Sequence, residues 1–196
     1  MPEPQLVDPN DPVMTGENSF LRLSNDSGQT FVHRISHWRV LWSAAGQGHV
    51  VFIESPLVGK SPRIYADNAA VARFLQSTIE VMLHKPFADE LLPITDAKFE
   101  RTGHSLSTVE ERIVSARDSI ILSWWNLMAP FVLTMPPGAL NRPLGVYTTF
   151  LPAREAQFVV NGEAATDAKV ILQDRFGRPA SSCCLAWSET WTKPKK

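Results

Sequence analysis

Hydrophobic and polar residues alternate along most of the chain in short segments, a pattern typical of β-strands buried on one face. The longest such segment covers residues 30–44. Period two places His33 and His37 on one face of this segment and Trp38 and Trp42 on the other. A turn at residues 45–48 and a return strand at residues 49–54 follow, so this region predicts a β-hairpin.

Strand-like segments also fill the chain after Pro93. Turn signals separate them, and Asn161-Gly162 is the strongest because this pair favours a two-residue hairpin turn. Short links favour antiparallel neighbours, since parallel strands need long crossovers. The further predicted strands are residues 63–66, 97–102, 107–116, 119–127, 131–135, 144–151, 156–160, 169–173 and 181–191.

One segment has the period of an amphipathic helix. Its apolar stripe follows the i, i+3, i+4, i+7 spacing and consists of Val71, Phe74, Leu75, Thr78, Ile79 and Met82. Asp67 is the expected N-cap, and Pro86 ends the pattern. The sequence therefore predicts a helix over about residues 67–85.

About ten strands and one helix predict a mainly β (α+β) protein. A twisted sheet of that size closes into a barrel or folds over as a sandwich, and the alternation does not separate the two. The fold that we expect is an antiparallel β-barrel or half-barrel with the helix packed on or across it. In outline it resembles the calycin-type ligand-binding barrels. The likeness is one of architecture, without a shared motif, and it implies no role for any residue.

The prolines near the N-terminus mark a different kind of segment. Pro2, Pro4, Pro9 and Pro12 predict an extended arm over residues 1–16. Residues 17–192 are then expected to form a single β-rich domain, and residues 193–196 a basic tail.

Composition narrows the class of protein. The 19 basic and 20 acidic residues give a formal net charge of −1, which argues against a nucleic-acid partner. There is no secretory signal pattern, and no apolar run is long enough to predict a membrane span. The two cysteines, Cys183 and Cys184, are adjacent and do not form a disulfide framework. We therefore expect a soluble, cytoplasmic protein.

No nucleotide-binding, zinc-binding or nucleophile-elbow motif occurs in the sequence, so neither a cofactor nor a metal is expected. His33 and His37 are the best candidates for a pair of metal ligands. In a strand, however, four residues span roughly 13 Å, so the two side chains could not hold one ion. Both remain candidates for acid–base catalysis or for hydrogen bonding inside a cavity.

Two glutamates interrupt apolar strand faces. Glu111 shares a face with Val109 and Ile113, and Glu189 shares one with Trp187 and Trp191. Burial among apolar side chains raises the pKa of a carboxyl group and prepares it for proton transfer near neutral pH. A register error of one residue would instead bury Glu110, and pairing with an arginine would make either glutamate structural.

The six tryptophans predict a large aromatic interior. Most of this area is expected to be core packing, but aromatic residues on both faces of some strands are typical of a ligand cavity. The candidate ligand-binding residues are Trp38, Trp42, Trp124, Asn126 and Trp187, with Asn126 as a polar anchor on the face of Trp124.

Three functions fit these observations. The first is a barrel that binds a small hydrophobic molecule in an aromatic-lined cavity. The second is a cofactor-free enzyme, of isomerase, hydratase or lyase type, that uses Glu111, Glu189, His33 or His37 on a small hydrophobic substrate in the same cavity. The third is a protein-interaction module with a solid barrel and an exposed apolar patch. We favour the first two over the third, with binding ahead of catalysis. The sequence leaves open whether the chain forms a homodimer.

Overall fold

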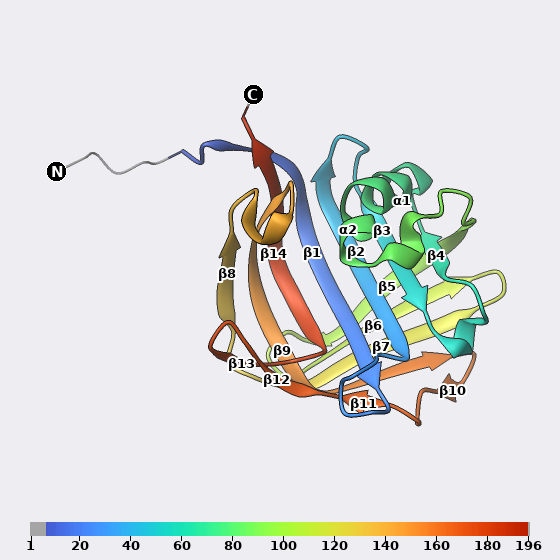
Figure 1. Cartoon of the computed structure of the whole chain (residues 1–196). Coiled ribbons are helices and arrows are strands. Elements are labelled where there is room, and N and C mark those ends of the chain that lie inside the picture. The colour runs from blue at the N-terminus through green and yellow to red at the C-terminus, as the bar shows by residue number, and fades with distance from the viewer. Residues whose placement is uncertain (1–6, 196) are drawn as a thin grey trace.

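The computed structural model describes residues 7–195 of the chain. Nine of its strands form a closed β-barrel in the order β9, β14, β1, β2, β3, β4, β5, β6 and β7, and β7 pairs with β9 to close it (Figure 1). The predicted β-barrel with one helix is therefore confirmed. The strands are β1 (Asn10–Ser24), β2 (His33–Ser43), β3 (Gly48–Glu54), β4 (Arg63–Ala66), β5 (Ile94–His104), β6 (Thr108–Ser115), β7 (Ser119–Leu127), β8 (Phe131–Met135), β9 (Gly145–Val160), β10 (Glu163–Ala164), β11 (Lys169–Val170), β12 (Leu172–Arg175), β13 (Arg178–Ser181) and β14 (Cys184–Pro194).

The barrel strands are antiparallel to their neighbours, as predicted, except that β4 and β5 are parallel. This exception follows from the chain between the two strands, which contains the helix and serves as the long crossover that a parallel pair needs. The predicted turn at Asn161-Gly162 joins β9 to β10, and both of its residues have the positive φ of a type I′ turn.

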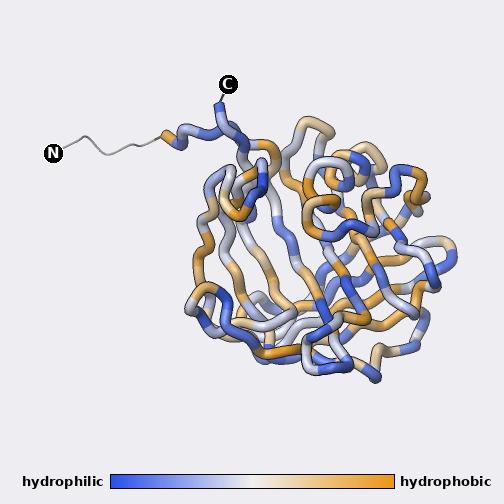
Figure 2. Tube along the Cα trace, in the orientation of Figure 1, coloured by the Kyte–Doolittle hydropathy of each residue, from blue (hydrophilic) through white to orange (hydrophobic). Residues whose placement is uncertain are grey.

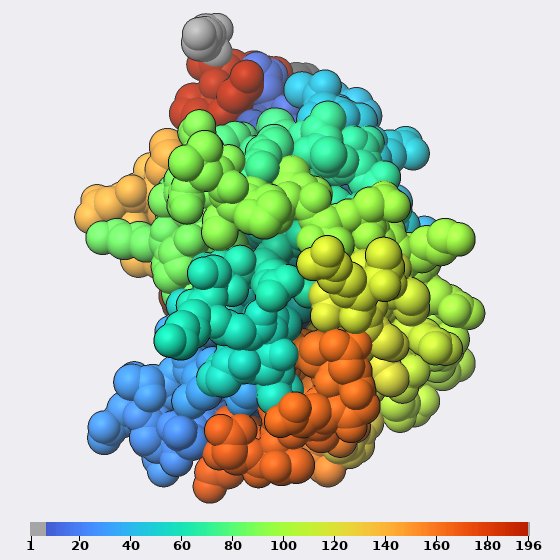
Figure 3. Space-filling model, turned by 90° about the vertical axis from the view of Figure 1, so that its right-hand side faces the viewer, coloured from blue at the N-terminus to red at the C-terminus, as the bar shows by residue number. Residues whose placement is uncertain are grey.

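The helix runs over 15 residues, as α1 (Ala69–Leu75), a π-helical turn (Gln76–Glu80) and α2 (Val81–Leu83). Its apolar stripe packs on the outside of the barrel, against Val50, Phe52 and Ile64. Figure 3 shows this side of the molecule, where the helical segment covers the upper part. The predicted N-cap, Asp67, is wrong by one residue. Asn68 accepts hydrogen bonds from the first free amides of the helix, and Asp67 accepts one from the backbone of His49 instead.

The N-terminal arm was predicted too long. Strand β1 begins at Asn10, pairs there with β14, and buries Met14 completely. The prolines predicted an arm because proline lacks the amide that strand pairing needs. Pro12 is nevertheless accommodated in β1, since it lies beside an irregularity in the pairing of β1 with β14. Residues 1–6 of the predicted arm and Lys196 of the predicted tail lie outside the described residues.

Several barrel strands are buried on both faces. Hydrophobic residues occur along these strands (Figure 2), and the inward-facing ones pack into one cluster inside the barrel. The outward face of β1, β2 and β3 packs under the helix. Strand β8 pairs with β9 in the same sheet, and its Phe131 and Leu133 pack against outward side chains of β1, β9 and β14. This second layer, outside the barrel, is where the candidate site lies.

Candidate functional site

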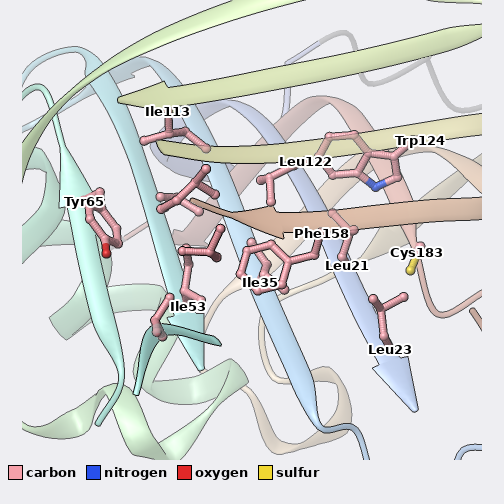
Figure 4. Close-up of a cluster of buried hydrophobic side chains, with 14 of the residues drawn as sticks. Leu21, Leu23, Ile35, Ile53, Tyr65, Ile113, Leu122, Trp124, Phe158 and Cys183 are labelled. Atoms are coloured by element: carbon pink, nitrogen blue, oxygen red, sulfur yellow. The ribbon is translucent and has the colours of Figure 1, made fainter. Parts of the chain in front are cut away.

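Hydrophobic side chains fill the centre of the barrel. Leu21, Ile35, Trp124 and Phe158 belong to one packed cluster there (Figure 4), and each is at most 2% exposed. Trp124 also donates its indole N–H to the carbonyl of Phe20 at 3.2 Å, which satisfies its polar atom within the core. The structure therefore does not confirm the expected aromatic-lined cavity at this position, and it favours a packing role for Trp124.

Glu111 faces into the barrel with Val109 and Ile113, as the alternation predicted. Burial raises the pKa of this carboxyl group, and the ion pair that it forms with Nε of Arg101 opposes the rise. His37 Nδ1 lies 3.9 Å from Oε1 of Glu111, which is beyond hydrogen-bond reach. Burial also lowers the pKa of His37 to about 3, so this ring is neutral at physiological pH. An ion-paired carboxylate beside a neutral, separated histidine favours a structural role for both.

Trp187 lies beside the same ion pair, with the guanidinium carbon of Arg101 5.4 Å from its ring centroid. A small cavity of about 190 Å³ adjoins this region, and its lining consists of Arg39, His49, Phe99, Arg101 and Glu111. Four of these five side chains are ionisable or charged, so the cavity does not suit the largely apolar ligand that the sequence predicted.

The remaining predicted residues lie apart from one another. His33 is buried, with Nδ1 2.7 Å from Oγ of Ser55 and Nε2 3.2 Å from Oδ1 of Asp167. Trp42 is 50% exposed. Asn126 is exposed and donates to Glu155, because its left-handed backbone (φ 53°) turns it away from the face of Trp124. The placement of Asn126 on that face was therefore wrong.

A groove of about 440 Å³ lies on the outer face of the barrel, over β1, β14 and β9. Strand β8, the following loop (residues 136–142) and the β12–β13 hairpin border one side, and α2 borders the other (Figure 1). Polar and charged side chains lie at its floor and rim. Its apolar lining consists of Phe20, Leu83, Leu133, Met135, Leu140, Val146, Phe150, Phe176 and Trp191. We call this site the outer groove.

Glu189 reaches the outer groove because of a β-bulge. The pairing of β14 with β9 shifts register between Trp187 and Thr190, and Ser188 has a left-handed backbone (φ 54°). The extra residue turns Glu189 and Trp191 outward, whereas Trp187 packs against the interior cluster. The predicted common face of Trp187 and Glu189 was therefore wrong.

The Glu189 carboxyl group is 4% exposed and accepts a hydrogen bond from the indole N–H of Trp191 at 2.7 Å. Burial raises its pKa to about 7, and the negative charge of Glu80 adds to this rise. Near neutral pH this group therefore exists in both protonated and ionised forms, as a proton donor or acceptor must.

A second carboxyl group, that of Glu80, comes from the π-helical turn. It accepts hydrogen bonds from Oγ of Ser36 and, at 2.5 Å, from Nε1 of Trp38, and it is 1% exposed. Burial raises its pKa as well. Asn18 lines the floor between the two acids, since it borders the outer groove and also the small hollow of about 30 Å³ that Glu80 lines.

Each buried acid is thus held by a tryptophan, and the ring centroids of Trp38 and Trp191 are 6.5 Å apart. Both acids are positioned by an irregular backbone, a π turn for Glu80 and a bulge for Glu189. Such irregularities occur frequently at functional sites. Of the nine residues predicted from the sequence, the structure brings Glu189 and Trp38 to this site.

Arginines stand at the edge of the groove. The guanidinium carbons of Arg22 and Arg175 lie 5.1 and 5.5 Å from the ring centroid of Phe20, and that of Arg175 is also 5.2 Å from Phe150. Arg142 is a further lining residue. These positions give an apolar groove with a cationic rim and an acidic floor.

Sequence reasoning missed Glu80, Asn18, Arg22 and Arg175. The positions of Asn18 and Arg22 could have been predicted from the period of two on β1. This period places both residues on the same outward face as Phe20. Glu80 gave no such signal, since the regular helical period does not include a π turn. Among residues 7–195, no group of three His, Cys, Asp or Glu side chains converges as metal ligands.

Comparison with known proteins adds little. No protein-family model matches the sequence, and no curated protein matches it. A crystal structure described as a "putative AttH" of Nitrosomonas europaea is 14% identical, with a TM-score of 0.35, over 100% of this chain and 58% of that one. The chain thus spans less than two thirds of that protein, and a likeness at this level assigns no activity. No helix within the described part of the chain is long and apolar enough to cross a membrane.

Proposed function

We propose that this protein binds a small, largely apolar molecule in the outer groove. The observation that carries the proposal is the lining, in which nine of the sixteen side chains around about 440 Å³ are apolar and two of the seven polar ones, Asn18 and Glu189, lie at the floor. Small-molecule sites typically have roughly 300–1,000 Å³ and combine apolar walls with polar groups at fixed positions. The filled centre of the barrel supports the choice of the outer groove over the interior.

Strand β8 offers a direct test, because its residues alternate between the groove and solvent. Leu133 lines the groove, whereas its neighbour Val132 is 73% exposed. Leu133→Trp should fill part of the groove and weaken binding of 1-decanol at least about tenfold, which corresponds to about 1.4 kcal/mol. Isothermal titration calorimetry measures the Kd.

Val132→Trp is the matched control, since it adds the same side chain on the same strand but outside the groove. We expect its Kd for 1-decanol to equal that of the wild type. Equal binding by the wild type and Leu133→Trp would place the ligand elsewhere, and no binding by the wild type would overturn the proposal.

A second candidate is a cofactor-free enzyme of isomerase, hydratase or lyase type that transfers protons at the same site. The specific observation in its favour is the pair of buried carboxyl groups, Glu80 and Glu189, each fixed by an indole N–H at the floor. Glu189 would be the proton donor or acceptor, because it lines the groove itself.

Native mass spectrometry of the purified wild type and Glu189→Gln separates the two candidates. If the protein only binds, both proteins should carry the same co-purified compound. If it is an enzyme, Glu189→Gln should retain an unconverted compound that differs from the one bound to the wild type.

A further inference from the structure

We infer that the ligand of the outer groove is an amphipathic carboxylate, whose single negative charge is held between Arg22 and Arg175. This inference rests on the proposed function and names the chemical class of the ligand. Its apolar part would lie along the groove wall formed by Leu133, Val146 and Phe150.

The two guanidinium groups converge on one side chain. Both lie over the ring of Phe20, at 5.1 and 5.5 Å from its centroid, and Arg175 also lies over Phe150. Stacking on aromatic faces fixes the planes of the guanidinium groups and leaves their edges free to donate. Two preoriented donors at the border of an apolar groove form a receptor for a planar anion.

Among the described residues, neither guanidinium group has a carboxylate in direct contact with it. Within residues 7–195, neither Arg22 nor Arg175 forms an ion pair with a carboxylate. Burial, together with the neighbouring charges of Arg175 and Arg34, lowers the pKa of Arg22 to about 10, although the charge of Glu80 opposes this shift. Partly buried like charges repel one another, so an anion between them would lower the energy of the site.

The floor and rim limit the charge of that anion. Glu189 and Asp174 line the same groove, and Glu80 lies beside it. These acids would repel a doubly charged group more strongly than a singly charged one. A carboxylate supplies one charge and also matches the flat, two-donor edge of a guanidinium group.

Calorimetric titration with decanoate, decyl phosphate and 1-decanol tests the inference, since the three share one alkyl chain. We expect decanoate to bind at least about tenfold more tightly than 1-decanol, as a charged hydrogen bond of this kind contributes about that much. Added salt should weaken the binding of decanoate and leave that of 1-decanol unchanged.

Arg175→Gln should abolish the preference for decanoate over 1-decanol. Arg178→Gln is the matched control, because Arg178 pairs with Arg175 across the same hairpin but is exposed and outside the groove lining. It should behave as the wild type.

Each other outcome has a definite meaning. Equal affinities for decanoate and 1-decanol would overturn the inference and leave the proposed function standing. Tighter binding of decyl phosphate than of decanoate would overturn the assignment of a carboxylate. Failure of 1-decanol to bind the wild type would remove the proposed function itself, on which this inference rests.

Discussion

Replacing Glu189 with glutamine should alter how the stability of the protein depends on pH. Glutamine keeps the oxygen that accepts from Trp191 and removes the proton equilibrium. Burial raises the pKa of Glu189 from 4.5 to about 7, so the folded state retains a proton that the unfolded state releases. The wild type therefore has the full benefit of this group below pH 4.5 and loses it as the pH rises to about 7.

The size of the effect follows from these two pKa values. Each pH unit between them costs about 1.4 kcal/mol, so the wild type should lose about 2 to 3 kcal/mol between about pH 5 and pH 8 through this group. Glu189→Gln should not show this loss. Its free energy of unfolding, relative to that of the wild type, should therefore be higher at pH 8 than at pH 5 by about the same 2 to 3 kcal/mol. Urea unfolding followed by far-ultraviolet circular dichroism at both pH values measures the difference.

Glu163→Gln is the control, because Glu163 is an exposed residue on β10 and the same charge is removed. It should change the free energy of unfolding equally little at both pH values. If Glu189→Gln shows the same pH dependence as the wild type, then Glu189 is not a protonated buried acid, and the reasoning fails.

Three further predictions concern the sites described above. Arg101→Met should lower the free energy of unfolding by about 3 kcal/mol, because it leaves Glu111 buried without a partner, and the double variant with Glu111→Leu should recover most of this loss in the same urea assay. Binding of decanoate should weaken above about pH 7, where Glu189 ionises among the groove's arginines and acids, and Glu189→Gln should remove that dependence in calorimetric titrations. Trp42→Ala should leave the affinity for 1-decanol unchanged in the same titration, since Trp42 is half exposed and away from the groove.

The strand pattern was predictable because a period of two leaves a clear trace. On β2 it separated His33 and His37 from Trp38 and Trp42. The predicted helix and the turn at Asn161-Gly162 were found for the same reason, since both depend on neighbouring residues. The sequence also has aromatic residues on both faces of some strands, but it could not show that a helix covers part of the outer face or that β8 pairs with β9 beside it.

The candidate site was only partly predictable because it depends on departures from regular periods. A bulge at Ser188 turns Glu189 outward, and a π-helical turn positions Glu80. The amino-acid types at these positions do not predict either irregularity. The convergence of Arg22 and Arg175 depends on contacts between β1 and a hairpin more than 140 residues away. Such contacts have no local sequence signature.

The most direct test of the outer groove compares two tryptophans of β14. Trp191 lines the groove, whereas Trp187 packs against the interior cluster. Titration with decanoate, followed by tryptophan fluorescence, should give a saturable change that disappears in Trp191→Phe and persists in Trp187→Phe. A change that persists in Trp191→Phe and disappears in Trp187→Phe would place the ligand inside the barrel and contradict the proposed site.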